Sequence, residues 1–242
     1  MSGARDDPPA QRSWTLEELR HAVRLVFAAG PGERVDTAAL AAAAGVSERQ
    51  VQRWLGGHAQ PGAGTAQRLR AALLPAADVL QRQEDDARNA ADAAVEVRRA
   101  LEQDGVLDGR AAVWAERGWL GEHLLLVVAN PDLGYARAGV VAAHAPHVAR
   151  LRTSKPRPAS VPGGLWQVLD AYATDHRFDA VLLRHALLQH VGPWRVAVHP
   201  ALVPKGHSDG WLAAAGVPDL SRLARRAGVR GRPAPPRWAE GA

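Results

Sequence analysis

Apolar positions in the first quarter of the chain recur at the three- and four-residue spacing of amphipathic helices. A first helix is predicted from four such positions: Leu16, Leu19, Val23 and Val26. Thr15 is placed to cap this helix, and Glu18 is placed to bond back to it as a capping box. Gly30-Pro31 ends the pattern.

The same local signals predict three more helices before residue 76. Asp36 can cap the second helix, and Ser47 can cap the third with Gln50 as its capping-box partner. Gly45 joins these two helices, and a fourth is predicted from Thr65 to Leu74. The sequence therefore predicts a compact all-α domain at the N-terminus.

Residues 76–104 are rich in alanine and charge and predict one long helix. Heptad intervals separate four apolar positions: Leu80, Ala87, Ala94 and Leu101. Because alanine buries little area, this seam is weak for a coiled coil. A connector that lies on one of the domains and a dimerising helix are both compatible with the pattern.

The remaining residues mix strand and helix signals. The pattern predicts strands at Leu124–Ala129, Gly139–Ala143 and Trp194–Val198, helices at Leu165–Ala173 and Phe178–Val191, and a proline-rich loop at Lys155–Pro162. We predict an α+β fold overall, with an all-α helix-turn-helix N-terminal domain, a long linker helix and a small mixed α+β C-terminal domain. The predicted boundaries are a disordered N-terminus (1–12), the helical domain (13–75), the linker helix (76–105), the α+β domain (106–228) and a basic, proline-rich tail (229–242).

Composition narrows the class of protein. The chain has 242 residues, 47% of them apolar, and it has no cysteine, which excludes disulfides and thiolate metal sites. It lacks an apolar run of the roughly 18 residues that a membrane span needs, and its N-terminus lacks a signal-peptide pattern. We therefore expect a soluble cytoplasmic protein.

The charge is unevenly distributed. Net charge is +5 for the chain, +2 for residues 1–75, −4 for 76–110 and +7 for 111–242. The two basic ends are compatible with a polyanionic partner. Codon bias is an alternative source of the basic excess, since 28 of the 30 basic residues are arginine.

The stretch DTAALAAAAGVSERQVQRWLGG, residues 36–57, has the residue pattern of a helix-turn-helix. Gly45 supplies the left-handed turn, and Ala41 is small enough for the two helices to approach closely. The other inward positions are aliphatic, small or aromatic: Leu40, Ala44, Val46, Val51 and Trp54. All of these positions together favour the motif.

Together with the helix before it and TAQRLRAAL after it, this stretch resembles the DNA-binding domain of the XRE family, the Cro and phage-repressor type. The resemblance covers about residues 14–75. It implies that the helix starting at Ser47 lies in the major groove of double-stranded DNA, and that dimers bind half-sites about one helical turn apart. The DNA-binding residues that it implies are Thr37, Ser47, Glu48, Arg49, Gln50, Gln52, Arg53 and His58. Gln60 and Arg68 are weaker candidates for backbone contacts.

Each residue type suits its implied role. Arg49 or Arg53 can bind guanine O6 and N7, Gln52 can bind adenine N6 and N7, and Glu48 can accept from cytosine N4. Ser47 and the helix N-terminus offer donors to a phosphate, and Thr37 is expected against a phosphate. The alternative is that these polar residues are only a solvated helix face.

Other constellations in the sequence are weaker. His144 and His147 are three residues apart, and His185 and His190 are five apart, which is not a same-face spacing on a helix; the sequence has no HExxH motif or cysteine partner for a metal. Lys205–Gly210 holds Ser, His and Asp without an oxyanion-hole motif. Residues 213–217 and 223–229 resemble the turn of the motif, but prolines follow both segments. We therefore reject them as second helix-turn-helix motifs. A run of C-terminal arginines could grip phosphates or be solvated: Arg222, Arg225, Arg226, Arg230, Arg232 and Arg237.

These observations predict a sequence-specific DNA-binding protein that is not an enzyme, has no catalytic or metal site and needs no cofactor. Its expected partner is double-stranded DNA, with a homodimer as an open option and no membrane. The expected role is transcription regulation as a repressor of phage or plasmid type. A replication, partition or packaging initiator remains an alternative. Another is an enzyme or toxin–antitoxin component whose N-terminal domain binds DNA only to regulate its own operon. The C-terminal domain could serve dimerisation, effector binding or a second DNA contact.

Overall fold

The computed structural model describes residues 14–29, 34–102, 109–145, 166–203 and 208–234. Its elements in chain order are α1 (Leu16–Val26), α2 (Thr37–Ala44), α3 (Glu48–Leu55), α4 (Ala63–Leu73), α5 (Ala77–Glu102), α6 (Gly109–Glu116), β1 (His123–Asn130), β2 (Tyr135–Ala142), β3 (Gln167–Thr174), α8 (Arg177–His190), η1 (Gly192–Trp194), β4 (Gly210–Leu212), η2 (Ala213–Ala215), α9 (Leu220–Arg226) and β5 (Gly231–Pro233). The predicted disordered N-terminus, the Gly30-Pro31 stop and the loop at 155–162 lie outside the described residues, as do His147, Lys205 and Arg237.

The chain divides into two compact units. The first contains residues 1–76 and 190–212, and the second contains residues 77–189 and 213–242. The fold is mixed α and β, with the N-terminal part helical and with a five-stranded sheet. Residues 190–212 group with the N-terminal helices through contacts between residues far apart in the sequence. Local sequence patterns do not reveal such contacts.

Local signals set the helix starts of the first unit. The capping box of Thr15 and Glu18 is present at α1, Asp36 caps α2 by accepting from Ala39 N–H, and Ser47 and Gln50 form the capping box of α3. These predicted caps are confirmed. The fourth helix begins two residues earlier than predicted, at Ala63, and has no side-chain cap.

Residues 190–212 close the helical unit. Trp194 stacks on Trp14 with ring centroids 6.5 Å apart, and Trp14 Nε1 donates to the Pro193 carbonyl at 2.8 Å. The N–H groups of Ala197 and His199 donate to the carbonyls of Leu73 and Leu25. Those carbonyls lie in the last turns of α4 and α1, where a helix leaves its acceptors without internal partners. The strand predicted at Trp194–Val198 is therefore wrong, because this extended segment bonds mainly to helix ends.

The strand order of the sheet is β4-β2-β1-β3-β5. β1 pairs antiparallel with both β2 and β3, and all eight of its residues are buried, as its apolar sequence predicts. The Asn130-Pro131-Asp132 signal forms the β1–β2 turn, with Asn130 Oδ1 accepting from Leu133 N–H at 3.1 Å. Both predicted strands of this hairpin are confirmed, although β2 begins four residues earlier than expected.

The helix predicted at Leu165–Ala173 is wrong, since this segment holds β3. The register with β1 shifts between Val127 and Val128, which leaves Leu169 as an extra residue in β3. Such a bulge breaks the two-residue alternation of a strand. Val168 and Ala171 consequently share one core face at a three-residue spacing, which imitates a helix in the sequence.

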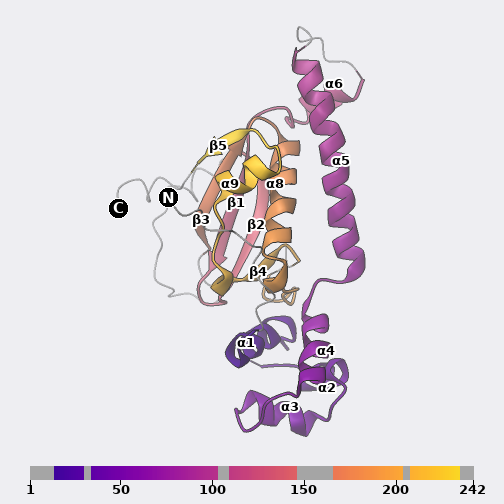
Figure 1. The fold of residues 1–242 in the computed structure, drawn as a ribbon, viewed down its shortest axis with the longest axis vertical. Helices are drawn as coiled ribbons and strands as arrows, with labels where there is room; N and C mark the ends of the chain where they lie inside the picture. Colours follow the sequence, from indigo (N-terminus) through magenta and orange to yellow (C-terminus); the bar gives the residue numbers. More distant parts are fainter. Residues whose placement is uncertain (1–13, 30–33, 103–108, 146–165, 204–207, 235–242) are drawn as a thin grey trace, which may run out of the picture. The chain divides into compact units, whose positions relative to one another are not determined.

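Figure 1 shows α8 lying along one face of the sheet and α5 running beside α8. A core cluster joins Ala90, Ala94 and Val97 of α5 to Phe178 of α8. Ala87 is also buried, whereas Leu101 is 54% exposed. The long helix thus packs into the second unit through its alanines, which favours the connector interpretation over a free dimerising seam.

The two sequence echoes of the turn do not lead into a second helix pair. Gly216 and Gly228 both have positive φ, but a three-residue 3-10 helix precedes Gly216, and strand β5 follows Gly228. Their rejection is confirmed. Within the described ranges, no helix is both long and apolar enough to cross a membrane, and no group of three or more potential ligands could hold a metal ion.

Candidate nucleic-acid interface

The site residues that the sequence predicts gather on α3 and its flanks. Val51 is fully buried against the unit, while Trp54 is half-buried. Arg49, Gln52 and Arg53 are exposed, at the spacing that places side chains along one face of a helix. In the part of the chain that the structure describes, their side chains form no hydrogen bond or ion pair. Helix α3 therefore presents two guanidinium groups and one amide to the solvent.

The capping box fixes the start of this helix. Ser47 Oγ accepts from Gln50 N–H at 3.4 Å, and Gln50 Oε1 accepts from Ser47 N–H at 3.2 Å. Gln50 is thus engaged through its carbonyl oxygen, which leaves the NH₂ group as its outward donor. Because these bonds hold the first turn, the side chains of α3 project from a defined backbone.

Thr37 and Glu48 lie together at the N-termini of α2 and α3. The Thr37 hydroxyl donates to Glu48 Oε2 at 2.9 Å. This bond uses the donor that the sequence assigns to a phosphate, and the Asp36 carboxylate caps the same turn. Glu48 keeps acceptor capacity, because a carboxylate has about four lone-pair positions. The start of α2 is consequently a poorer place for a phosphate than the sequence suggests.

The turn between α2 and α3 is held from α4. Gly45 has φ +65° and ψ +43°, the left-handed conformation that glycine adopts without steric cost. Arg68 Nε donates to the Ala44 carbonyl at 2.9 Å, and Arg68 Nη2 donates to Thr65 Oγ1 at 3.1 Å. The Arg68 guanidinium thus braces the turn, and the DNA-backbone contact that the sequence suggests for it stays a prediction.

Two further basic groups lie at the loop after α3. His58 is exposed, and its N–H donates to the Arg53 carbonyl at 2.8 Å. A guanidinium nitrogen of Arg20 lies 3.4 Å from the position that a Cβ at Gly57 would occupy. Arg20 is absent from the sequence-based set, because its position in α1 gives no local sign of nearness to this loop.

No protein-family model, curated protein or solved structure matches the chain. The assignment of this surface therefore depends on its own geometry and chemistry.

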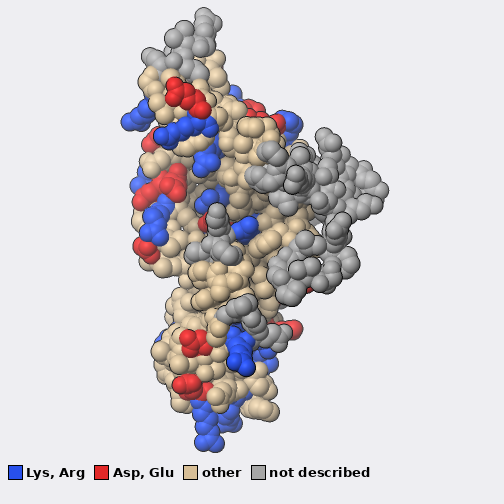
Figure 2. Space-filling model, turned by 180° about the vertical axis from the view of Figure 1, so that it is seen from behind, with Lys and Arg blue, Asp and Glu red and all other residues tan. Residues whose placement is uncertain are grey.

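Acidic side chains accompany the basic ones on this surface. Figure 2 shows basic side chains gathered at the end of the helical unit where α3 lies, with acidic ones nearby. The C-terminal arginines of the second unit are a separate group, in which Arg225, Arg226 and Arg230 are exposed and Arg232 pairs with Glu122 at 2.6 Å. Long-range attraction to a polyanion is thus modest at α3.

Proposed function

We propose that the first unit binds double-stranded DNA as a helix-turn-helix of the XRE type, with α3 in the major groove. The observation that carries the proposal is the exposed row of Arg49, Gln52 and Arg53 on a helix whose start and preceding turn are both fixed. Long polar side chains with no internal partner on such a helix are suited to direct readout.

The groups in this row match the edges of different bases. A guanidinium presents a planar pair of donors that fits guanine O6 and N7, and a glutamine amide fits adenine N6 and N7. Each correct bidentate pair discriminates against a wrong base by about 1–3 kcal/mol. Arg49 and Arg53 would therefore read guanines, with Gln52 reading an adenine.

The phosphate contacts come from other positions. The first backbone N–H groups of α3 would attract a phosphate to the helix N-terminus, while the Ser47 hydroxyl already donates to Gln50 Oε1 at 3.3 Å. His58 and Arg20, beside the loop after α3, would approach the backbone at the other end of the helix. Because residues 1–75 carry a net charge of only +2, we expect non-specific affinity to be low and salt dependence to be shallow for one chain.

The biological role that we propose is transcription regulation by occupancy. A protein that reads a specific site with little non-specific affinity marks that site and excludes polymerase from it. A repressor of phage or plasmid type fits this description.

Selection of bound duplexes from a random DNA pool tests the proposal. We expect one enriched consensus containing guanine and adenine positions, and a palindrome if two chains bind together. The Gln52→Ala variant should relax preference at one position while keeping the rest of the consensus. A selected pool indistinguishable in sequence from the input would contradict sequence-specific binding.

A further inference from the structure

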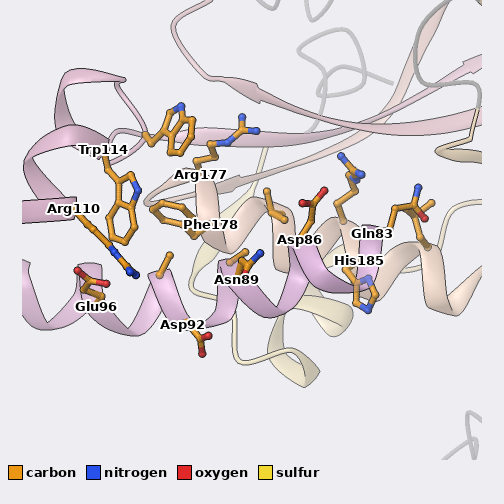
Figure 3. A pocket seen from close by; sticks show the side chains of 16 residues that line it. Gln83, Asp86, Asn89, Asp92, Glu96, Arg110, Trp114, Arg177, Phe178 and His185 are labelled. Carbon is orange, nitrogen blue, oxygen red and sulfur yellow. The ribbon is translucent and has the colours of Figure 1, made fainter. Parts of the chain in front are cut away.

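A cavity of about 490 Å³ opens in the second unit, among α5, α6 and α8 (Figure 3). Its size lies within the range of about 300–1,000 Å³ that is usual for small-molecule sites. All of its walls belong to this unit, and none of them includes a residue of the proposed DNA-binding surface. The cavity is therefore unexplained by DNA binding.

One wall of the cavity is aromatic. Trp114 meets Phe178 edge-on with ring centroids 4.7 Å apart, and Trp119 meets the same phenyl ring at 6.0 Å. Phe178 is 6% exposed and belongs to the core, while both indoles are half-buried and keep surface toward the cavity. Rings fixed in this way give a planar ligand a rigid surface for stacking.

Guanidinium groups lie beside this wall. Arg177 stands over the Trp119 ring at 5.1 Å, and Arg184 follows it two turns later on the same face of α8. Burial lowers the pKa of the Arg177 guanidinium, the nearby Arg184 lowers it further, and Asp86 acts in the opposite direction. Two cations close together in a half-buried place form a favourable site for an anionic group.

The opposite wall supplies hydrogen-bonding groups from α5. Figure 3 shows Gln83, Asp86, Asn89 and Glu96 along this helix, facing Arg177, Phe178 and Trp114. Among the described residues, Asp86 and Glu96 form no ion pair. Acceptors and amides at this edge suit the polar rim of a heteroaromatic ring. Since acidic and basic groups both line the cavity, it is suited to a ligand of matching shape and charge placement and not to anions in general.

We propose that this cavity binds a small planar aromatic molecule that carries one anionic group. The ring lies against Trp114 and Phe178, and the anion lies between Arg177 and Arg184. Nucleotides and aromatic carboxylic acids both have this chemistry. The proposal is independent of the proposed function, because it concerns other residues in the other unit.

Isothermal titration calorimetry of the full chain tests the proposal with AMP and with indole-3-acetate. We expect at least one of these probes to bind at one site per chain, and the tighter probe identifies nucleotides or aromatic acids as the source. Adenosine and ribose 5-phosphate, which each lack one half of the recognised chemistry, should bind at least about 10-fold more weakly. Absence of saturable binding by both probes at about 5 mM overturns the proposal.

Variants locate the site. Arg177→Gln and Arg184→Gln should each weaken the bound probe by about 10-fold or more, since each removes a charge-assisted hydrogen bond. Arg88→Gln is the matched control, because Arg88 lies on α5 outside the cavity and its side chain is 67% exposed. If circular dichroism shows that the Arg177→Gln protein is unfolded, the Arg184→Gln variant alone tests the location of the site. Wild-type affinity in a folded Arg184→Gln protein overturns the assignment.

Discussion

Gly45 is the residue on which the geometry of α2 and α3 depends most. Its φ of +65° places it where an L side chain is strained, and a Cβ there would lie 3.4 Å from Arg68 Nε. Arg68 holds the Ala44 carbonyl through that same nitrogen. A side chain at position 45 would therefore strain both the backbone and the Arg68 side chain that holds it.

We expect Gly45→Ala to lower the free energy of unfolding by about 1–2 kcal/mol. Urea denaturation followed by circular dichroism measures it. Gly64→Ala is the matched control, since Gly64 lies in the first turn of α4 and the nearest atom to its added Cβ would be 3.9 Å away. The control should be neutral or slightly stabilising, because alanine favours a helix by about 0.5–1 kcal/mol. Equal destabilisation by both changes would contradict the role given to the turn.

His176 is the buried histidine that precedes α8. Its side chain is 2% exposed, its Nδ1 accepts from Asp179 N–H at 3.3 Å, and its Nε2 lies 3.5 Å from Asp179 Oδ2. Burial lowers the pKa of His176, with Arg98 and His123 acting in the same direction and with Asp179 and Asp175 opposing them. Burial also lowers the pKa of His123, which Arg177 and His144 lower further and the Gly121 carbonyl raises.

We expect these histidines to make the fold less stable as the pH falls below about 6.5, the ordinary histidine pKa. The unfolded chain then binds protons that the folded chain resists, so the histidine contribution is present above that pH and is lost below it. Asp179, whose pKa burial raises, acts in the opposite direction. His176→Asn keeps an acceptor for the cap and removes this titration, so it should reduce the loss of stability between pH 7.5 and 5.5.

Urea denaturation at both pH values provides the comparison, with His58→Asn as a control at an exposed position. A loss of stability in His176→Asn equal to that of the wild type would show that His176 does not contribute to the pH dependence.

At the scale of elements, residues 190–212 are part of the helical unit. Trp194 is 6% exposed and stacks on Trp14, and the residues after it bond to the ends of α1 and α4. The four N-terminal helices are thus completed by chain that lies more than a hundred residues downstream. Their stability depends on that segment as well as on their own caps.

We expect Trp194→Ala to destabilise the first unit by about 3–5 kcal/mol, because it removes a large buried ring. Thermal unfolding and limited proteolysis within residues 14–76 measure this effect. Leu101→Ala is the control, since Leu101 is 54% exposed and its loss should cost under about 0.5 kcal/mol. Unchanged protease resistance of α1–α4 in Trp194→Ala would show that these helices fold independently of residues 190–212.

How far the elements follow from the sequence depends on the range of the interactions that form them. The starts of α1, α2 and α3 were predictable, because each cap joins residues three positions apart. β3 was not, because the bulge at Leu169 exists only against β1 and disguises the strand. Residues 195–199 have a strand-like alternation, but their main partners are distant helix ends.

The candidate interface was predictable in outline and less so in detail. The exposure of Arg49, Gln52 and Arg53 agrees with their outward positions in the motif. The sequence could not show that Thr37 donates to Glu48 or that Arg68 braces Ala44, because these are contacts between different helices. The DNA-binding roles themselves stay predictions.

The whole chain combines a helical unit, whose α3 exposes Arg49, Gln52 and Arg53, with an α+β unit that holds a separate cavity. The alanine seam of α5 is buried in the second unit at Ala87 and Ala94. Two chains that bind a palindrome would therefore associate through other surfaces. Exposed arginines near the C-terminus, Arg225, Arg226 and Arg230, and the cavity are candidates for the further roles considered for the second unit.

Arg49 and Arg53 are the residues that we propose to read DNA from α3. The most direct measurement is fluorescence anisotropy with the selected duplex, comparing wild type, Arg49→Ala with Arg53→Ala, and Arg82→Ala with Arg88→Ala. The control arginines lie on α5, with side chains 66% and 67% exposed. We expect the α3 double variant to lose at least about 30-fold in specific affinity, since two base contacts of about 1–3 kcal/mol each are removed, and the control to bind like wild type. Equal binding by all three proteins, or no specific binding by the wild type, would contradict the account.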